Sequence, residues 1–451
     1  MSREMIDRAL ARATDTKACE IGEGVLGRTA ALFGGFFPGA KRAIVVSDPR
    51  TRAAAGESVC GLLRSAGVDV AEHVIEPGGR TFHGDYKYAE EVREAIKAAG
   101  VERDGAAIVP VAVGSGVVND VTKRAAGELG VPYMTVGTAA SVDGYSSFGA
   151  ALRSPEGAKQ TYPCPAPRVI VADLDVMRTA PAWMASSGFA DLMAKVPAGA
   201  DWILAFELGA TPWHDSAWHT VQDGLKEAIG DAEGVAAMAT GPLTRFVEGL
   251  MLGGFAMQDM QSSRPASGAE HMFSHLLEMR DHTYKGEIVP HGIQVGVFTL
   301  FMCRVYEQIL ARDYSGLDVD KCLENWRPLA EEEKIGAAMF AGTRFPDIGV
   351  KAVRAKFIDR EATRARLEDF KARWPAIRAR LAEQLVPATE IERRLKAVGA
   401  PVSPEGIGST VAATLADARK TVYMRDRYMA LDFLALTGEL DEFARRAYEA
   451  V

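Results

Sequence analysis

The sequence has few cysteines, and none of them are paired in a spacing that would hold a metal. Its five cysteines are scattered without a Cys-x-x-Cys pair, which favours a reducing compartment and excludes a metal cage built from thiolates. The opening residues, MSREMIDRALARATDTK, lack the apolar core of a signal peptide. No stretch reaches the ~18–20 apolar residues that a membrane span requires. We therefore expect a soluble, cytoplasmic protein with no membrane partner.

An excess of positive charge is also absent. The chain has 52 Lys and Arg against 60 Asp and Glu, a formal net charge of −8, whereas phosphate-backbone binding needs a concentrated positive field. Basic residues do crowd positions 351–398, but KFIDREATRARLEDFKARW interleaves acids at helical spacing, as a solvated helix face does. The composition therefore argues against a nucleic-acid partner.

The 451 residues exceed what one core usually supports, so more than one lobe is expected. Through roughly the first 175 residues, runs rich in Val and Ile alternate with helical patterns, and the predicted strands cover 41–48, 68–77, 106–116, 131–138 and 167–173. Because these runs are apolar throughout, they predict a parallel sheet covered on both faces. Beyond about residue 180 the patterns are helical. We predict an α/β Rossmann-like nucleotide-binding domain over residues 1–178, followed by an all-α domain over residues 179–451.

Two glycine-rich segments are candidates for binding a dinucleotide phosphate. GEGVLG, Gly22 to Gly27, matches Gly-x-Gly-x-x-Gly, and Asp48 follows about 20 residues later, as the dinucleotide fingerprint requires. However, the preceding TKACEI is a poor buried strand, and the alternative is a turn that opens a helix.

GSGVVNDVTK, Gly114 to Lys123, follows the strongest predicted strand and opens a helix, where backbone N–H groups can approach a pyrophosphate. Asn119 and Asp120, in the first helical turn, are alternatively capping residues. Asp48 is either an acceptor for ribose hydroxyls or an acid that starts a turn before Pro49.

Four of the eight histidines, His271, His275, His282 and His291, fall in one neighbourhood. His271 and His275 are four residues apart and therefore share a helical face, and His291 stands at a predicted helix start. A single imidazole is usually a satisfied core or surface histidine, but this clustering makes a metal site an equal alternative. Asp191, in SSGFADLMAK, is a candidate carboxylate, and two histidines plus a carboxylate with an open position is how catalytic zinc is held.

Five segments together resemble the glycerol-1-phosphate dehydrogenase family, which lies within the superfamily of iron-type alcohol dehydrogenases, glycerol dehydrogenase and dehydroquinate synthase. They are VAVGSGVVNDVTK, GTAASVDGYSS, GFADLMAK, SSRPASGAEHMFSH and HGIQVG. The resemblance runs in collinear order from about residue 40 to 300. Residues beyond about 310 carry no recognisable motif.

The resemblance implies one divalent metal, zinc with nickel or iron as alternatives, held by Asp191, His271 and His291. It implies substrate-binding and catalytic roles for Asp143, Asp191 and His275, so that only one histidine of the pair binds the metal. It implies NAD(P) contacts at Asp48, Gly114, Gly116, Val117, Val118, Asn119, Asp120, Thr138, Ala139, Ala140, Ser141 and Ser147.

The implied activity is the reversible reduction of dihydroxyacetone phosphate to sn-glycerol 1-phosphate by an enzyme that is a homodimer or larger. One alternative is an NAD-dependent dehydrogenase of glycerol or another polyol or sugar phosphate. A second is a lyase of the dehydroquinate-synthase kind, although SVDGYSSFGAAL lacks the Lys and Arg that its substrate would need. A relative without catalysis is a third. Arg264 is a candidate for the substrate phosphate or, equally, a structural ion-pair partner.

Overall fold

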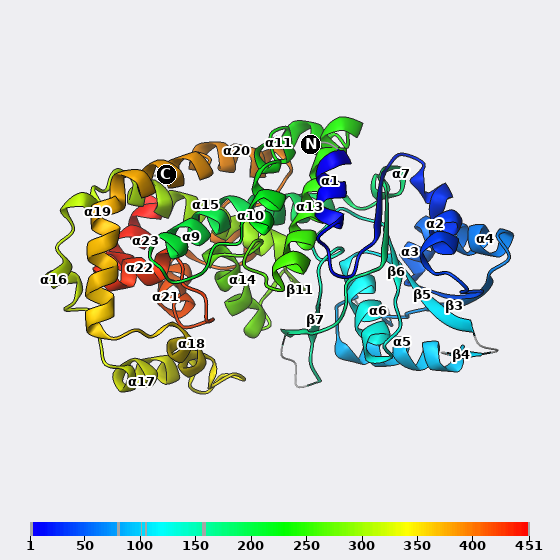
Figure 1. Cartoon of the computed structure of the whole chain (residues 1–451), viewed down its shortest axis with the longest axis horizontal. Coiled ribbons are helices and arrows are strands. Elements are labelled where there is room, and N and C mark those ends of the chain that lie inside the picture. The colour runs from blue at the N-terminus through cyan, green and yellow to red at the C-terminus, as the bar shows by residue number, and fades with distance from the viewer. Residues whose placement is uncertain (1–2, 79–81, 101, 104–105, 156–158, 450–451) are drawn as a thin grey trace. The chain divides into compact units, whose positions relative to one another are not determined.

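A computed structural model describes residues 3–78, 82–100, 102–103, 106–155 and 159–449 (Figure 1). The chain forms two compact units. Unit 1 consists of Met1–Leu192, Ser216–Ser263 and Ala397–Gly399, and unit 2 consists of Met193–Asp215, Arg264–Lys396 and Ala400–Val451. The predicted boundary between an α/β domain and an all-α domain, at residue 178, stays a prediction.

Unit 1 is built on a parallel sheet with the strand order β1-β9-β6-β5-β2-β3. The strands are β1 (Ala18–Gly22), β2 (Arg42–Ser47), β3 (Asp69–Val74), β5 (Ala106–Gly114), β6 (Met134–Gly137) and β9 (Val169–Asp173), with β4 (Glu102–Arg103) antiparallel to β5. The hairpin of β7 (Ala150–Arg153) and β8 (Lys159–Tyr162) lies outside this sheet. All five predicted strands are confirmed.

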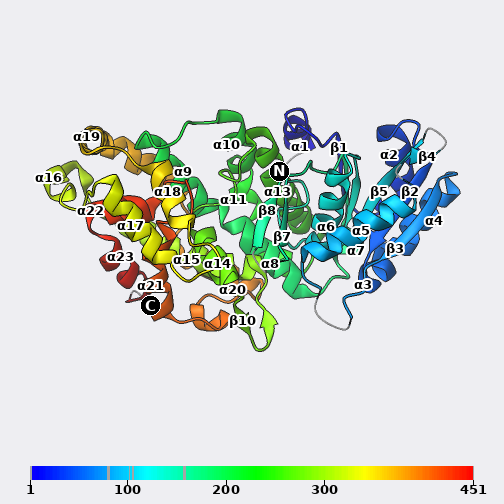
Figure 2. The ribbon, with the colours of Figure 1, turned by 90° about the horizontal axis from the view of Figure 1, so that it is seen from below.

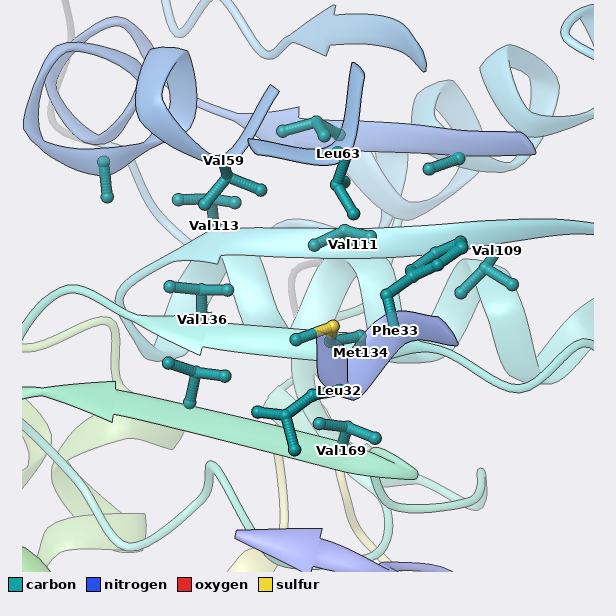
Figure 3. Packing of buried hydrophobic residues seen from close by; sticks show 14 of the residues in the cluster. Leu32, Phe33, Val59, Leu63, Val109, Val111, Val113, Met134, Val136 and Val169 are labelled. Carbon is teal, nitrogen blue, oxygen red and sulfur yellow. The ribbon is translucent and has the colours of Figure 1, made fainter. Parts of the chain in front are cut away.

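Alternate residues of the buried strands enter two separate cores. On one face, Val111, Val113 and Val136 pack in a cluster with residues of α2 (Thr29–Phe36) and α4 (Glu57–Ser65) (Figure 3). On the other face, Ile44 and Ala112 pack with residues of α5 (Tyr86–Ala98) and α6 (Gly116–Glu128). The sheet is therefore covered on both faces, as continuous apolar strands require.

The segment before Gly22 was expected to be a poor buried strand and was not among the predicted strands; it does form a strand, but only its first two residues are buried. Ala18–Gly22 forms β1, an edge strand paired in parallel with β9. Ala18 and Cys19 are buried, whereas Glu20 is partly exposed and forms a salt bridge of 2.6 Å with Arg28. An edge strand tolerates such a charge because only part of it enters the core.

The remaining helices of unit 1 flank or follow the sheet. They are α1 (Arg3–Leu10), η1 (Val25–Arg28), α3 (Pro49–Thr51), η2 (Arg52–Gly56), α7 (Leu174–Met177), α8 (Ala182–Met193), α10 (Asp215–Gln222), α11 (Leu225–Ala228), α12 (Ala232–Ala236) and α13 (Thr240–Met260).

Unit 2 is helical, as predicted, apart from the small hairpin of β10 (Thr283–Tyr284) and β11 (Glu287–Ile288) (Figure 2). Its helices are α9 (Lys195–Glu207), α14 (Ala269–Met279), α15 (His291–Ala311), η3 (Tyr314–Gly316), α16 (Val319–Cys322), α17 (Leu329–Phe340), α18 (Ile348–Lys356), α19 (Arg360–Gln384), α20 (Ala388–Ala397), η4 (Pro404–Ile407), α21 (Val411–Thr421), α22 (Ala430–Thr437) and α23 (Leu440–Glu449).

One helix departs from the expectation that no stretch is long and apolar enough for a membrane span. Among the described residues, α15 meets that criterion by length and composition, with a mean hydropathy of 1.2. However, 72% of the window that meets it is buried in the structure. A helix in the core of a protein can meet the same criterion of length and hydropathy, and the burial of α15 is typical of such a core helix.

Candidate functional site

The connections after β2 and β5 diverge at the carboxyl edge of the sheet. These two strands are neighbours, but β2 leads to β3 on one side and β5 leads to β6 on the other. Such a switch point opens a crevice at which doubly wound sheets bind nucleotides. Asp48 directly follows β2, and the turn Gly114-Ser115-Gly116 follows β5. The sheet topology therefore brings these two candidate cofactor elements to the same crevice.

The turn after β5 requires glycine and leaves the start of α6 without a side-chain cap. A Cβ atom on Gly114 would lie 2.5 Å from Val118, and one on Gly116 would lie 2.9 Å from Val142. Ser115, the N-cap of α6, makes no side-chain capping hydrogen bond. The first amides of an α-helix have no partner within the helix and attract anions. This turn therefore fits the pyrophosphate of a dinucleotide.

GEGVLG is less suited to a phosphate because carboxylates of the same chain already occupy its amides. The Leu26 N–H donates to Asp173 at 2.6 Å, and the Gly24 N–H donates to Asp175 at 3.1 Å. Gly24 has a φ of 67° and leads into the 3-10 helix η1. GEGVLG therefore has the geometry of a turn that opens a helix, which was the alternative to a phosphate-binding loop.

Asp48 caps α3. Its Oδ1 accepts hydrogen bonds from the backbone N–H groups of Arg50 and Thr51, at 2.8 and 3.0 Å, and its own N–H donates to Thr51 Oγ1 at 3.0 Å. The capping role is therefore present, and it uses one of the two carboxylate oxygens.

The polar side chains in the first turns of α6, Asn119 and Asp120, contact other residues of the protein. Asn119 is buried and accepts from the Tyr133 hydroxyl at 3.1 Å. Asp120 accepts from the Ala151 N–H at 3.2 Å and pairs with Lys123 at 3.3 Å. These contacts fix the helix under the turn.

Lys123 is a fully buried cation for which no role was predicted from the sequence. Its Nζ donates to the carbonyl oxygens of Gly144 and Gly149, each at 3.0 Å. Ser147 Oγ donates to the same Gly144 carbonyl at 3.1 Å. Lys123 therefore fixes the segment that carries Ser147 and follows Asp143. Its position at the end of the quoted GSGVVNDVTK motif was the available signal.

The loop after β6 packs tightly against α8. The Thr138 N–H donates to the Gly114 carbonyl at 3.0 Å, and the Ala139 carbonyl accepts from the Tyr145 hydroxyl at 2.7 Å. Thr138 through Ser141 are buried. On α8, Asp191 is 1% exposed, and its Oδ2 accepts from the Asp143 N–H at 3.2 Å. The fold thus brings two predicted substrate residues, Asp143 and Asp191, into contact.

In unit 2, the three predicted histidines come together. The ring centroid of His271 lies 6.3 Å from that of His275 and 5.3 Å from that of His291, and the last two are 5.8 Å apart. His271 and His275 lie on α14, and His291 is the first residue of α15, as predicted. His282 has a different role, since its Nε2 contacts the Ile407 carbonyl at 2.6 Å.

Buried acids determine where α14 begins. Asp201 accepts a hydrogen bond from the Ala269 N–H at 2.7 Å, and Glu270 accepts one from the Gly268 N–H at 2.6 Å. A Cβ atom on Gly268 would lie 2.6 Å from the Asp201 carboxylate, which explains the glycine. Burial and the nearby Glu270 raise the pKa of Asp201 to about 6. The helix that carries His271 and His275 thus starts in a fixed position.

Two glutamates orient the histidine rings. Glu270 contacts His271 Nδ1 at 2.8 Å. The two oxygens of Glu278 contact His275 Nδ1 at 3.1 Å and His291 Nδ1 at 3.0 Å. Because an ionised carboxylate only accepts hydrogen bonds, each Nδ1 carries the proton and each neutral ring presents Nε2 as a lone pair. These glutamates were not predicted from the sequence, although Glu278 lies three residues after His275 on the same helical face.

This arrangement predicts a loss of metal affinity in Glu278→Gln. The amide can accept from one imidazole but presents N–H donors to the other, and when that other ring is His291 it must change its tautomer and lose the Nε2 lone pair proposed to bind the metal. We expect ~10- to 100-fold weaker metal binding, measured by competition with a chelator.

The matched control for Glu278→Gln is Ser274→Ala. This change removes the second contact of His291 Nδ1, 3.1 Å to Ser274 Oγ, but leaves the carboxylate in place. It should weaken metal binding much less. Equal metal affinity in Glu278→Gln and the unmodified protein would show that Glu278 does not set the tautomers.

His275 is half-buried, whereas Arg264 is buried. Desolvation, together with the neighbouring Arg425, lowers the pKa of His275 to about 3, although Glu278 opposes this shift. Arg264 is 4% exposed and donates to the backbone carbonyls of Tyr428 and Asp201, at 3.0 and 3.2 Å. Those contacts give Arg264 a structural role.

Comparisons with known proteins agree with this architecture. A family model described as iron-containing alcohol dehydrogenase matches residues 20–181. A probable glycerol dehydrogenase from Sinorhizobium meliloti has the same fold, with a TM-score of 0.59 at 17% identity over 96% of this chain and 98% of that chain. At this identity the likeness concerns the fold alone.

Two sequence relatives carry the same name, glycerol-1-phosphate dehydrogenase, NAD(P)+. The relative from Halalkalibacterium halodurans is 33% identical over 264 residues, and the match spans 58% of this chain but 64% of that protein. The relative from Geobacillus stearothermophilus is 30% identical over 368 residues, which is 82% of this chain and 80% of that protein. The chain therefore belongs to the glycerol-1-phosphate dehydrogenase family, among the iron-containing alcohol dehydrogenases.

Proposed function

We propose that this protein interconverts dihydroxyacetone phosphate and sn-glycerol 1-phosphate with NAD(H) or NADP(H). The observation that carries the proposal is the set of three histidines whose Nδ1 atoms all face glutamates, in a chain whose relatives are named for this activity. A dehydrogenase of this kind must bind a dinucleotide and stabilise the oxygen of a carbinol or ketone. The residues of the chain fit both tasks.

The proposed metal ligands are Asp191, His271 and His291. The three residues offer one carboxylate oxygen and two imidazole nitrogens. This donor set suits a catalytic zinc with an open coordination position, and nickel or iron accept similar ligands. The proton positions support the assignment, since His271 and His291 both present Nε2. Zinc is our choice of ion because oxygen and nitrogen donors with an open site are its usual catalytic environment.

The proposed NAD(P) contacts lie on three segments of unit 1. The turn after β5 and the loop after β6 flank the same edge of the sheet, and Asp48 follows the neighbouring strand. The full set is Asp48, Gly114, Gly116, Val117, Val118, Asn119, Asp120, Thr138, Ala139, Ala140, Ser141 and Ser147. Asn119 and Asp120 also bind the chain and so help to hold the turn.

The proposed substrate residues are Asp143, Asp191 and His275. Glu278 holds the proton of His275 on Nδ1, so Nε2 accepts a hydrogen bond from a substrate hydroxyl. The buried Asp191 also fixes the backbone next to Asp143. When bound, the metal polarises the carbonyl as a Lewis acid and the nicotinamide supplies the hydride. The side chains orient the triose and position its transferable proton.

We also propose a cytoplasmic location and a homo-oligomer of at least two copies, with no nucleic-acid or membrane partner. The net charge of −8 and the burial of α15 support the absence of such partners.

Cofactor choice is predicted to respond to the charge of Asp48. A carboxylate hydrogen-bonds a ribose 2′-hydroxyl and repels a 2′-phosphate, so NADH should serve at least as well as NADPH. Asp48→Asn keeps the cap on α3, because asparagine is an equally good N-cap, but removes the charge. We expect this variant to shift kcat/KM toward NADPH by ~10-fold, since charged hydrogen bonds contribute about 1.5–3 kcal/mol.

The control for Asp48→Asn is Thr51→Ala, which breaks the capping box without changing the charge. Its NADPH/NADH ratio should equal that of the unmodified protein. A strong native preference for NADPH that Asp48→Asn leaves unchanged would place Asp48 away from the ribose.

The activity is tested with a substrate panel and both cofactors. Dihydroxyacetone phosphate should be reduced far better than dihydroxyacetone, and sn-glycerol 1-phosphate should be oxidised while the 3-phosphate enantiomer is not. Equal oxidation of both enantiomers, or a preference for free glycerol, would instead assign a general polyol dehydrogenase. Conversion of a sugar phosphate without net NADH consumption would assign a lyase.

A further inference from the structure

The segment Val422–Met429, here called the arginine loop, connects α21 to α22 in unit 2. Its sequence, VYMRDRYM, contains Arg425 and Arg427 and lies in the part of the chain where no family motif was recognised. The loop contacts the histidine set directly. It is therefore a candidate part of the substrate site that the resemblance did not reveal.

Arg425 reaches the substrate-facing histidine. Its Nη2 lies 3.4 Å from His275 Nε2. Because the Nδ1 proton of His275 faces Glu278, Nε2 is the acceptor and the guanidinium is the donor, and a bound substrate hydroxyl would take the place of the guanidinium at this nitrogen. The ring of His275 is in turn 5.8 Å from that of His291, centroid to centroid. Arg425 therefore places a cation beside the atom of His275 that we assign to the substrate.

Arg425 is a half-buried cation. Partial burial lowers the pKa of its guanidinium, and the charges of Asp426 and Glu278 oppose that shift. The planar fork of guanidinium donors matches phosphate in a bidentate geometry. Arg264, the earlier candidate, donates instead to the carbonyls of Tyr428 and Asp201.

Neighbouring side chains hold the arginine loop close to the start of α14. Arg427 is buried and donates to Ser267, to the hydroxyl at 2.7 Å and to the carbonyl. Arg264 donates to the Tyr428 carbonyl through both terminal nitrogens at 3.0 Å. These bonds fix the loop to the SRPASG segment directly before α14.

Helices α17 and α18 hold the other side of the loop. Glu332 of α17 accepts from the Tyr423 hydroxyl at 2.9 Å, and Lys356 of α18 donates to Asp432, just after the loop, at 2.5 Å. The two helices pack backbone to backbone, because a Cβ atom on Gly349 would lie 2.1 Å from the Gly336 carbonyl oxygen. This helical pair therefore supports the loop as a rigid element.

We infer that Arg425 binds the phosphate group of the triose substrate, and that α17 and α18 hold the arginine loop in the position this requires. The inference rests on the proposed function, which assigns His275 to the substrate. It gives the helices beyond residue 310 a role in selecting a phosphorylated substrate.

The test compares Arg425→Ala, Arg425→Lys and the control Arg419→Ala in the metal-loaded full-length protein. Arg419 lies on α21, where it pairs with Asp441 at the surface. Calorimetry measures the binding of inorganic phosphate, and kinetics give kcat and KM for dihydroxyacetone phosphate and for dihydroxyacetone. Metal content in each preparation reports whether the site is intact.

We expect Arg425→Ala to weaken phosphate binding and raise KM for dihydroxyacetone phosphate by ~10- to 100-fold, with a clearly smaller loss of kcat/KM for free dihydroxyacetone, since Arg425 also contacts His275. Arg425→Lys should show a smaller loss, because the point charge remains but the fork is lost. Arg419→Ala should match the unmodified protein. Unchanged phosphate affinity in Arg425→Ala, or equal losses for both substrates, would overturn the inference.

A failure of the proposed function gives a different result. The unmodified protein would then show no preference for dihydroxyacetone phosphate over dihydroxyacetone. Phosphate calorimetry still decides the role of Arg425 in that case, since a loss of phosphate affinity in Arg425→Ala supports an anion site and its retention refutes one.

Discussion

Replacing His271 by alanine is expected to remove the bound divalent metal and to lower kcat/KM by a factor on the order of 1,000 or more. A Lewis acid contributes several kcal/mol to stabilising the oxygen of the transition state, and each factor of ten corresponds to about 1.36 kcal/mol. His271 is 6% exposed, and its ring is oriented by Glu270 at 2.8 Å. Elemental analysis of the purified variant measures the metal directly.

Two other histidines provide the matched controls for His271→Ala. His275→Ala should keep its metal but lose activity, because we assign its imidazole to the substrate. His282→Ala should keep both, since His282 contacts the Ile407 carbonyl and lies outside the set. Full metal occupancy in His271→Ala would remove this residue from the ligands. Loss of metal in His275→Ala to the same extent would refute the separate roles of the two histidines.

The sheet was predictable from sequence because its interior strands are apolar on both faces. The runs around β2, β5 and β9 contain almost no polar residue, so no helix period competes with the strand assignment. β1 was missed for the opposite reason. Glu20 breaks its apolar run, and the salt bridge to Arg28 that makes this charge tolerable joins residues whose proximity depends on the fold.

In the histidine set, the elements were predictable but the partners were not. The spacing of His271 and His275 indicated a shared helical face, and Pro290 indicated the start of the helix that begins at His291. Glu278 joins two histidines of different helices, and Arg425 reaches His275 from 150 residues away. Such contacts depend on tertiary packing, which no local pattern encodes. The roles assigned to these residues stay predictions.

The close packing of α8 against the loop after β6 leads to the second large expected effect. A Cβ atom on Gly188 would lie 2.2 Å from the Ala140 carbonyl oxygen and 3.0 Å from the Ser141 carbonyl carbon. Both obstacles are backbone, so no side-chain rotation can relieve the clash. Gly188 stands three residues before Asp191, on the same face of the helix. A displacement at Gly188 therefore affects the proposed cofactor loop and a proposed metal ligand together.

We expect Gly188→Ala to reduce the free energy of unfolding by about 2–3 kcal/mol or more, since overpacking a close backbone contact costs this much. The matched control is Gly61→Ala on α4, where a Cβ atom would meet nothing within 4 Å. That change replaces a helical glycine with a better helix former and should stabilise the protein by about 0.5–1 kcal/mol. Denaturant titration of both variants gives the two free energies of unfolding. Titration with NADH measures whether the loop after β6 still binds the cofactor. If Gly188→Ala were as stable as the unmodified protein and bound NADH equally well, α8 would have room to move away from Ala140. In that case the packing of α8 against Ala140 would not fix the position of Asp191. The short distance from a Cβ atom at Gly188 to the Ala140 carbonyl oxygen would then no longer explain the glycine.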